Sequence, residues 1–238
     1  MKATILLRLL IPFCGFVIAN AKDEDTKKKI SIPKAITEIK SKLAHLENFR
    51  VEQFTKMQTF MTHIRIINHD LLLSNLTAEL NNIRTAVNTT KEEGKETENC
   101  FEAATKCAEE IRKATESTLL ECVHVSLYDF INRSNISNKI QAEAKGIIDQ
   151  LSATLFTCSS RRFDKRQCFV LRSKESTDRF KRFHETFNWY LNYHEEIVKR
   201  VSDQANSCLH KSLCESTKRI ADMQVVAKTC IEDARDHL

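Results

Sequence analysis

The residues that decide the fold are 100–122, which read CFEAATKCAEEIRKATESTLLEC. Small, apolar or cysteine side chains recur there at alternating intervals of four and three residues, at Cys100, Ala104, Cys107, Ile111, Ala114, Thr118 and Cys122. That spacing is the period of an α-helix with one buried face. The segment is therefore predicted to be an amphipathic helix whose cysteines lie on the buried stripe.

The same period runs through most of the chain, which has 238 residues but only three glycines and two prolines. Sheet folds draw on Gly and Pro for their many tight turns, so this composition favours long helices. Helices are expected over about 33–90, from 97 to the polar stretch 132–138, from there to about 157, and from the connector 159–167 to about 234. The predicted fold class is all-α, an elongated bundle of three to four long amphipathic helices stapled by disulfides.

One irregularity interrupts the first helix. Its apolar frame ends at Leu46 and resumes at Met57, and between them it would meet Arg50 and Gln53. In this interval the apolar positions are Phe49 and Phe54, which lie next to the positions that the frame predicts. We interpret this as a local shift of the stripe within a continuous helix.

Residues 1–21 are expected to be a cleaved signal peptide. Lys2 is followed by an apolar stretch over 5–18 and by the small-x-small pattern Ala19-Asn20-Ala21. Residues 22–32 would then be a flexible N-terminus, 33–96 a long cysteine-free helix with its connector, and 97–238 a disulfide-stapled helical domain. The expected localisation is secreted and extracellular, with retention in the endoplasmic reticulum as an alternative suggested by the terminal Arg-Asp-His-Leu.

The mature chain would carry 35 basic and 32 acidic residues, a net charge of +3. This balance does not indicate a nucleic-acid partner, and after the signal no apolar run is long enough to span a membrane.

Cleavage after residue 21 leaves eight cysteines, an even number that predicts four disulfides in an oxidising compartment. Two intervals of 22 residues, Cys100 to Cys122 and Cys208 to Cys230, each return to nearly the same helix face. If the chain folds back between Cys158 and Cys168, three nested pairs follow: Cys100–Cys230, Cys122–Cys208 and Cys158–Cys168. Their position sums are 330, 330 and 326, as an antiparallel hairpin requires.

Cys107 and Cys214 remain as the fourth pair. Their position sum is 321, about nine residues or ~13 Å out of register between straight helices. Because a disulfide needs Cα atoms within about 7 Å, either a kink corrects the offset or this connectivity is wrong.

The cysteine spacing of residues 97–232 resembles that of the cysteine-rich helical proteins of insects typified by the tsetse EP protein domain. The matching elements are Cys100-x6-Cys107, Cys158-x9-Cys168, Cys208-x5-Cys214 and a late Cys230. The resemblance implies secretion, often by gut or other epithelia, and no established enzyme activity. It carries over no functional residue beyond the cysteines.

Catalytic signatures are missing from the sequence, which contains no phosphate-binding glycine loop, GxSxG, HExxH or CxxC motif. His184-Glu185 and His194-Glu195-Glu196 are expected to be solvated or half-packed helical pairs. The protein is therefore expected not to be an enzyme and to need no cofactor or metal.

A basic connector is the one candidate binding site with named charges. Arg161, Arg162, Lys165 and Arg166 fall within six positions between two cysteines. Such a loop would suit a polyanion, a sulfated glycan or an anionic surface. The alternatives are a solvated turn without a partner and a dibasic site cut by a processing protease.

Aromatic residues gather on the last helix. Phe180, Phe183, Phe187 and Tyr190 form a stripe expected in the core, while Trp189 and Tyr193 share a second face. That second face is expected either to contact a partner or to form another core face.

Four Asn-x-Ser/Thr sequons predict glycosylation at Asn75, Asn88, Asn132 and Asn135. Asn75 is the least suitable of them, because it lies inside a predicted helix.

The sequence thus predicts a secreted, disulfide-stabilised helical protein that acts by binding a protein or glycan partner, contacting a polyanionic surface through its basic loop. The alternative function is an extracellular carrier that holds an apolar ligand or lipid between its helices.

Overall fold

The structure, a computed structural model, describes residues 31–159 and 165–236, with side chains left undescribed over 165–176. Four α-helices make up nearly all of it: α1 (Ile32–Glu92), α2 (Glu98–Ser134), α3 (Ile136–Ser159) and α4 (Lys165–Asp236). No strand occurs in these ranges. The all-α class is confirmed, while the predicted signal peptide at 1–21 lies outside the described residues.

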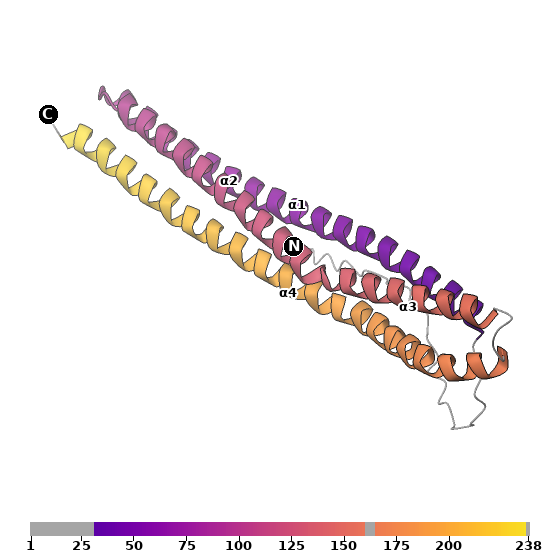
Figure 1. The fold of residues 1–238 in the computed structure, drawn as a ribbon. Helices are drawn as coiled ribbons and strands as arrows, with labels where there is room; N and C mark the ends of the chain where they lie inside the picture. The colour runs from indigo at the N-terminus through magenta and orange to yellow at the C-terminus, as the bar shows by residue number, and fades with distance from the viewer. Residues whose placement is uncertain (1–30, 160–164, 237–238) are drawn as a thin grey trace, which may run out of the picture. The chain divides into compact units, whose positions relative to one another are not determined.

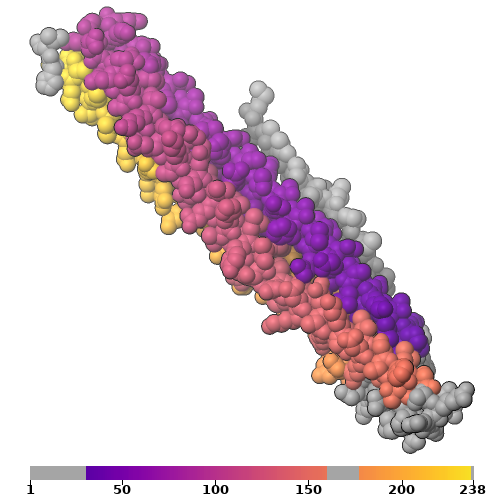
Figure 2. Space-filling model, turned by 45° about the horizontal axis from the view of Figure 1, so that its top comes forward, coloured from indigo at the N-terminus to yellow at the C-terminus, as the bar shows by residue number. Residues whose placement is uncertain are grey.

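The helices form three packed rows rather than four (Figure 1). The chain runs along α1, returns along α2 and α3 in succession, and runs back along α4. Figure 2 shows α1 and the α2–α3 row lying against each other over their length. From Ile32 onward the described residues form one compact unit, in which α1 shares its core with α2, α3 and α4.

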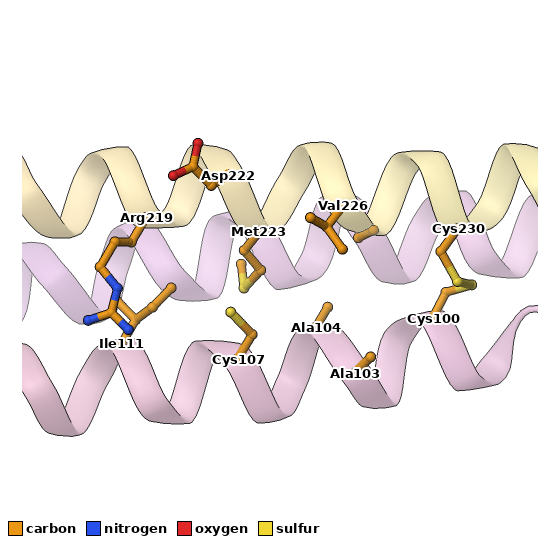
Figure 3. A pocket seen from close by; sticks show the side chains of 11 residues that line it. Cys100, Ala103, Ala104, Cys107, Ile111, Arg219, Asp222, Met223, Val226 and Cys230 are labelled. Carbon is orange, nitrogen blue, oxygen red and sulfur yellow. A yellow bond between two sulfur atoms is a disulfide. The ribbon is translucent and has the colours of Figure 1, made fainter.

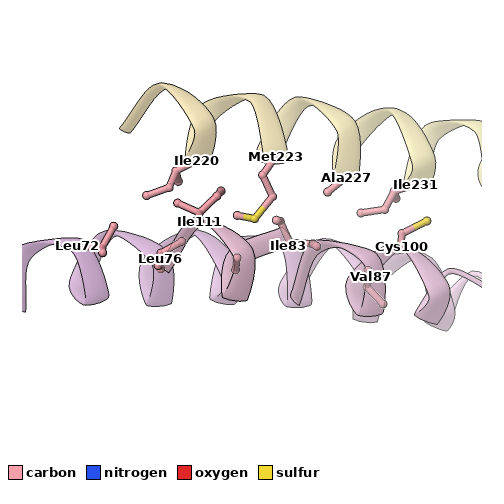
Figure 4. Close-up of a cluster of buried hydrophobic side chains, with 12 residues drawn as sticks. Leu72, Leu76, Ile83, Val87, Cys100, Ile111, Ile220, Met223, Ala227 and Ile231 are labelled. Carbon is pink, nitrogen blue, oxygen red and sulfur yellow. The ribbon is translucent and has the colours of Figure 1, made fainter. Parts of the chain in front are cut away.

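That core is a chain of clusters along the bundle, each drawing on three rows. Near the α1–α2 turn, Leu76 and Val87 of α1 pack with Ile111 of α2 and with Met223 and Ile231 of α4 (Figure 4). At the opposite end, α3 replaces α2 beside α1 and α4. The predicted aromatic stripe is confirmed there, because its four residues are all buried: Phe180, Phe183, Phe187 and Tyr190.

The turn between α1 and α2 depends on Gly94, whose φ of 83° lies in the left-handed region. Its N–H donates to the Lys91 carbonyl at 2.9 Å, which closes α1. Thr97 occupies the N-cap position of α2, but its hydroxyl makes no cap and instead donates to the carbonyl of Val87 at 3.3 Å. The hydroxyl therefore ties the turn back to α1.

The predicted break at 132–138 is confirmed, since only Asn135 separates α2 from α3. Asn135 keeps helical angles, with φ −66° and ψ −12°, and the flanking backbone bonds join residues three apart, Asn135 to Asn132 and Asn138 to Asn135. The row formed by α2 and α3 therefore has a local irregularity at Asn135, after which α3 continues along the bundle in the same general direction as α2.

Two of the predicted disulfides are present. Cys100–Cys230 and Cys122–Cys208 both join α2 to α4 across a Cα–Cα distance of 5.8 Å. Cys158 is also disulfide-bonded, but Cys168 falls where side chains are undescribed, so the expected Cys158–Cys168 pair lies outside the described residues.

The expected pair Cys107–Cys214 is wrong, because both residues are free. The two disulfides set the register, which places Cys107 opposite Met223, and Cys214 lies nine residues before Met223 on α4. No kink brings them together, since α4 is one continuous helix over Lys165–Asp236. The expectation of four disulfides and no free thiol fails for this geometric reason.

Candidate functional site

An open groove lies in the seam between α2 and α4, beside the Cys100–Cys230 disulfide (Figure 3). We call it the seam groove; its volume is about 350 Å³. Alanines occupy facing positions, Ala103 and Ala104 on α2 and Ala227 on α4, so side chains there are too short to fill the space between the helices. The groove exists because the disulfide holds the two helices at a set spacing over these small residues.

The floor of the seam groove is apolar and sulfur-rich. The thiol of Cys107 and the thioether of Met223 point toward each other across it, with Ile111 at one end (Figure 3). Arg219 and Asp222 stand on the α4 rim, and Arg219 extends toward α2. This lining offers contact area and one charge of each sign.

The second free thiol is exposed. Cys214 Sγ lies 3.7 Å from Nδ1 of His210, one turn earlier on α4. An exposed thiol of this kind reacts with added reagents far more readily than a half-buried one such as Cys107.

The basic connector falls largely outside the description. Arg161 and Arg162 lie outside the described residues, and Lys165 and Arg166 begin α4 without described side chains. The polyanion site therefore remains a prediction from the sequence.

Trp189 and Tyr193 stack on each other at 4.8 Å between ring centroids, with planes 11° apart. Trp189 is half exposed, whereas Tyr193 is partly buried and packs against the core cluster that contains Met57, Val123 and Ile197, so the pair lies at the edge of the core.

The structure corrects the expectation for His194, which is buried and only 2% exposed. Its ring packs edge-on against Phe49 of α1 at 5.0 Å and Phe130 of α2 at 5.5 Å. Burial lowers the pKa of His194, because a charged imidazole would lose its hydration there.

His184 is half-packed, as expected. Its pKa is lowered mainly by burial and also by the nearby Lys42, against an opposing effect of Glu38. The Nε2 atom lies 3.2 Å from Glu38 Oε1 without forming a hydrogen bond.

The sequons differ in accessibility. Asn88, Asn132 and Asn135 are exposed at or near helix ends, whereas Asn75 is half-buried in the middle of α1. Glycosylation itself stays a prediction.

Sequence reasoning missed the rim and floor residues that α4 contributes to the seam groove: Arg219, Asp222, Met223 and Val226. The available signal was the register of the nested cysteines, which places Met223 opposite Cys107. Alanine at positions 103, 104 and 227 then marked where two helices would leave space.

Within the described ranges, no three His, Cys, Asp or Glu side chains gather as metal ligands do. The same ranges contain no helix apolar enough over sufficient length to cross a membrane. No family model, curated protein or solved structure matches this chain. The chain is a disulfide-stabilised helical bundle, and its disulfides indicate an oxidising compartment.

Proposed function

We propose that this protein is a secreted, non-catalytic binding protein whose stapled bundle holds preformed contact surfaces. The observation that carries the proposal is the seam groove, an open apolar groove held by the Cys100–Cys230 disulfide. A surface fixed before binding loses less conformational entropy when a partner arrives. The cysteine spacing that resembles the EP domain family supports the same proposal of secretion.

The proposed polyanion contact rests on charge concentration in the basic connector, at Arg161, Arg162, Lys165 and Arg166. Each exposed ionic contact contributes roughly 1 kcal/mol or less, so several must act together and their effect must fade with salt.

Heparin chromatography tests this contact. Replacing all four connector residues with alanine is expected to lower the salt concentration at elution. The matched control carries alanine at four exposed basic residues of α4, Lys199, Arg200, Lys211 and Lys218, which removes the same charge elsewhere. Equal elution of the two variants would show that retention reflects net charge and that the connector is no site.

The alternative function, a carrier of an apolar ligand, is favoured by the same groove of about 350 Å³, which lies within the usual range of ligand pockets of about 300–1,000 Å³. Native mass spectrometry of protein from a secreting host should then detect a co-purifying apolar molecule. Ala103→Trp, which fills the groove, should remove that molecule, whereas Ala78→Trp on the exposed face of α1 should retain it. An empty wild-type protein would favour the binding function over the carrier.

A further inference from the structure

A second groove opens where the α2–α3 row bends. We call it the break groove; its volume is about 330 Å³. On α1, Leu46 and Met57 are 0% and 3% exposed, but Phe54 between them is 36% exposed. Phe54 loses its cover because α2 ends at Ser134 and α3 starts at Ile136 on the facing row. The shifted stripe at Phe49–Phe54 and the helix break therefore meet at one level of the bundle.

The floor of the break groove holds two polar side chains, one of which has a buried atom without a hydrogen-bond partner among the described residues. His194 lines it at 2% exposure, and its ring lies edge-on against Phe49 and Phe130. Ser134 lines it too, and its Oγ is buried without a hydrogen-bond partner in the described part of the chain. Leaving the Ser134 hydroxyl unpaired costs about 1–3 kcal/mol, so it points to a further group that hydrogen-bonds to it, and the His194 ring beside it can add a second donor.

The charge of this groove is positive. Arg50 is the lining residue with a full charge, and its Nη1 donates to Asn138 Oδ1 at 2.9 Å. Glu47 Oε2 lies 3.8 Å from the same Nη1, in an ion pair whose side chains are 38% and 56% exposed. A guanidinium has five N–H donors, so most stay available for a second acceptor.

The remaining wall is apolar and open to solvent. Val51 is 60% exposed and Ile131 is 49% exposed, with Phe54 and Phe130 between the helices. An arginine, a serine hydroxyl and an imidazole can all donate to one anionic acceptor, while the apolar wall receives a hydrocarbon.

The geometry points to a binding site for an amphipathic carboxylate. Arg50, Ser134 and His194 donate hydrogen bonds to the carboxylate, and Val51, Phe54 and Ile131 cover its apolar chain. The site is separate from the seam groove and from the basic connector, so it extends the proposed function to a second surface with a stated ligand class.

The test uses the full mature chain and decanoate as the probe. Asn135 lines the groove and heads a sequon, so the protein is made in an oxidising host compartment without N-glycosylation. Decanoate should shift the ring resonances of His194 saturably in nuclear magnetic resonance spectra. Decylammonium, with the same chain and the opposite charge, should bind at least about tenfold more weakly.

Two variants locate the site. Arg50→Gln should weaken decanoate binding about tenfold or more, whereas the control Arg65→Gln, also on α1 but outside the groove, should not. Val51→Trp should block binding by filling the groove at an exposed position where folding is little affected.

The inference is overturned if the His194 resonances do not respond, if decylammonium binds equally well, or if Arg50→Gln and Arg65→Gln behave alike. The break groove then holds only water. Decanoate that perturbs residues around Cys107 instead would overturn this inference while supporting the carrier function, so the two failures are distinguishable.

Discussion

Cys107 and Cys214 show how one residue's position along a helix decides its chemistry. Both lie on helices joined by disulfides, yet neither has a cysteine within reach. An even cysteine count predicts complete pairing, but a disulfide forms only where Cα atoms come within about 7 Å. The distance between the two cysteines, and not the even number of cysteines in the chain, therefore decides that they stay unpaired.

Thiol titration of protein cleaved after Ala21 should find two free thiols per chain in denaturant. In the native protein Cys214 should react first, because it is exposed, and Cys107 more slowly, because it is half-buried. Cys214→Ser should remove the fast phase and leave the slow one. Zero free thiols would show that these residues are paired after all.

His194 should make the protein sensitive to acid. Its unfolded-state pKa is about 6.5 and burial lowers the folded-state pKa, so the unfolded chain binds more protons as the pH falls. The contribution of His194 to stability is complete above about pH 6.5 and is lost as the pH drops toward the folded-state pKa.

Urea unfolding at pH 7.5 and pH 5.5 measures this effect. His194→Phe should reduce the loss of unfolding free energy between the two pH values, with a remainder from His184, whose pKa is also lowered. His63→Phe, at an exposed position of α1, should lose as much as wild type. An unchanged pH dependence in His194→Phe would contradict the assignment.

At the scale of elements, one helix of 72 residues, α4, pairs with two successive helices of 37 and 24 residues. The bend at Asn135 lets the shorter helices follow α4 on both sides of the break. Tyr190 of α4 lies at this level, fully buried, with its hydroxyl directed at the Ser134 carbonyl at 3.5 Å. The bend thus opens a groove on the side that faces α1, while His194 of α4 lines its floor.

Gly94 has a left-handed backbone conformation and Gly146 a helical one, so the same substitution at the two glycines should have opposite effects on stability. Gly94→Ala should cost about 1–2 kcal/mol of unfolding free energy, because φ is 83° while a Cβ would meet no atom within 4 Å. Gly146→Ala, inside α3, should stabilise by about 0.5–1 kcal/mol, since its Cβ would be in ordinary contact with Arg179 at 3.8 Å. Denaturant titrations giving the same sign for both would contradict the backbone explanation.

For the whole molecule, the two disulfides hold α2 and α4 in one register over 22 residues, about 33 Å of helix. Polar contacts between α1 and α2 fix the alignment of α1 along the other two rows. His69 Nε2 lies 2.9 Å from Glu116 Oε1 of α2, and Arg112 contacts both Glu116 and Glu109. These contacts are partly exposed and add specificity more than stability.

Replacing Cys100 and Cys230 together with alanine should lower the unfolding free energy by about 2–4 kcal/mol. Cys122–Cys208 still joins α2 to α4 near the middle of the bundle, so the loss of stability should be largest between this disulfide and the end of the bundle where Cys100 and Cys230 lie. Amide hydrogen exchange should therefore accelerate in the first half of α2 and the end of α4, and stay unchanged in α3. Acceleration spread evenly through α3 would show that the disulfide acts on global stability alone.

The sequence by itself determined the helical class, the connector between about residues 90 and 97, the break near Asn135 and two of the disulfides. Periodicity and a constant rise per residue are properties of a single helix, so positions 22 residues apart on two segments can be matched without coordinates. The same arithmetic showed Cys107 and Cys214 out of register, although the even count favoured pairing them.

Tertiary structure alone decided the burial of His194 and the positions of both grooves. His194 is enclosed by Phe49 and Phe130, which come from two other helices far away in the chain. The seam groove forms where the short side chains of Ala103 and Ala227 face each other across two helices. The break groove forms where the α2–α3 row is interrupted at Asn135. Such space is a property of several segments together, because packing density depends on what every neighbour contributes.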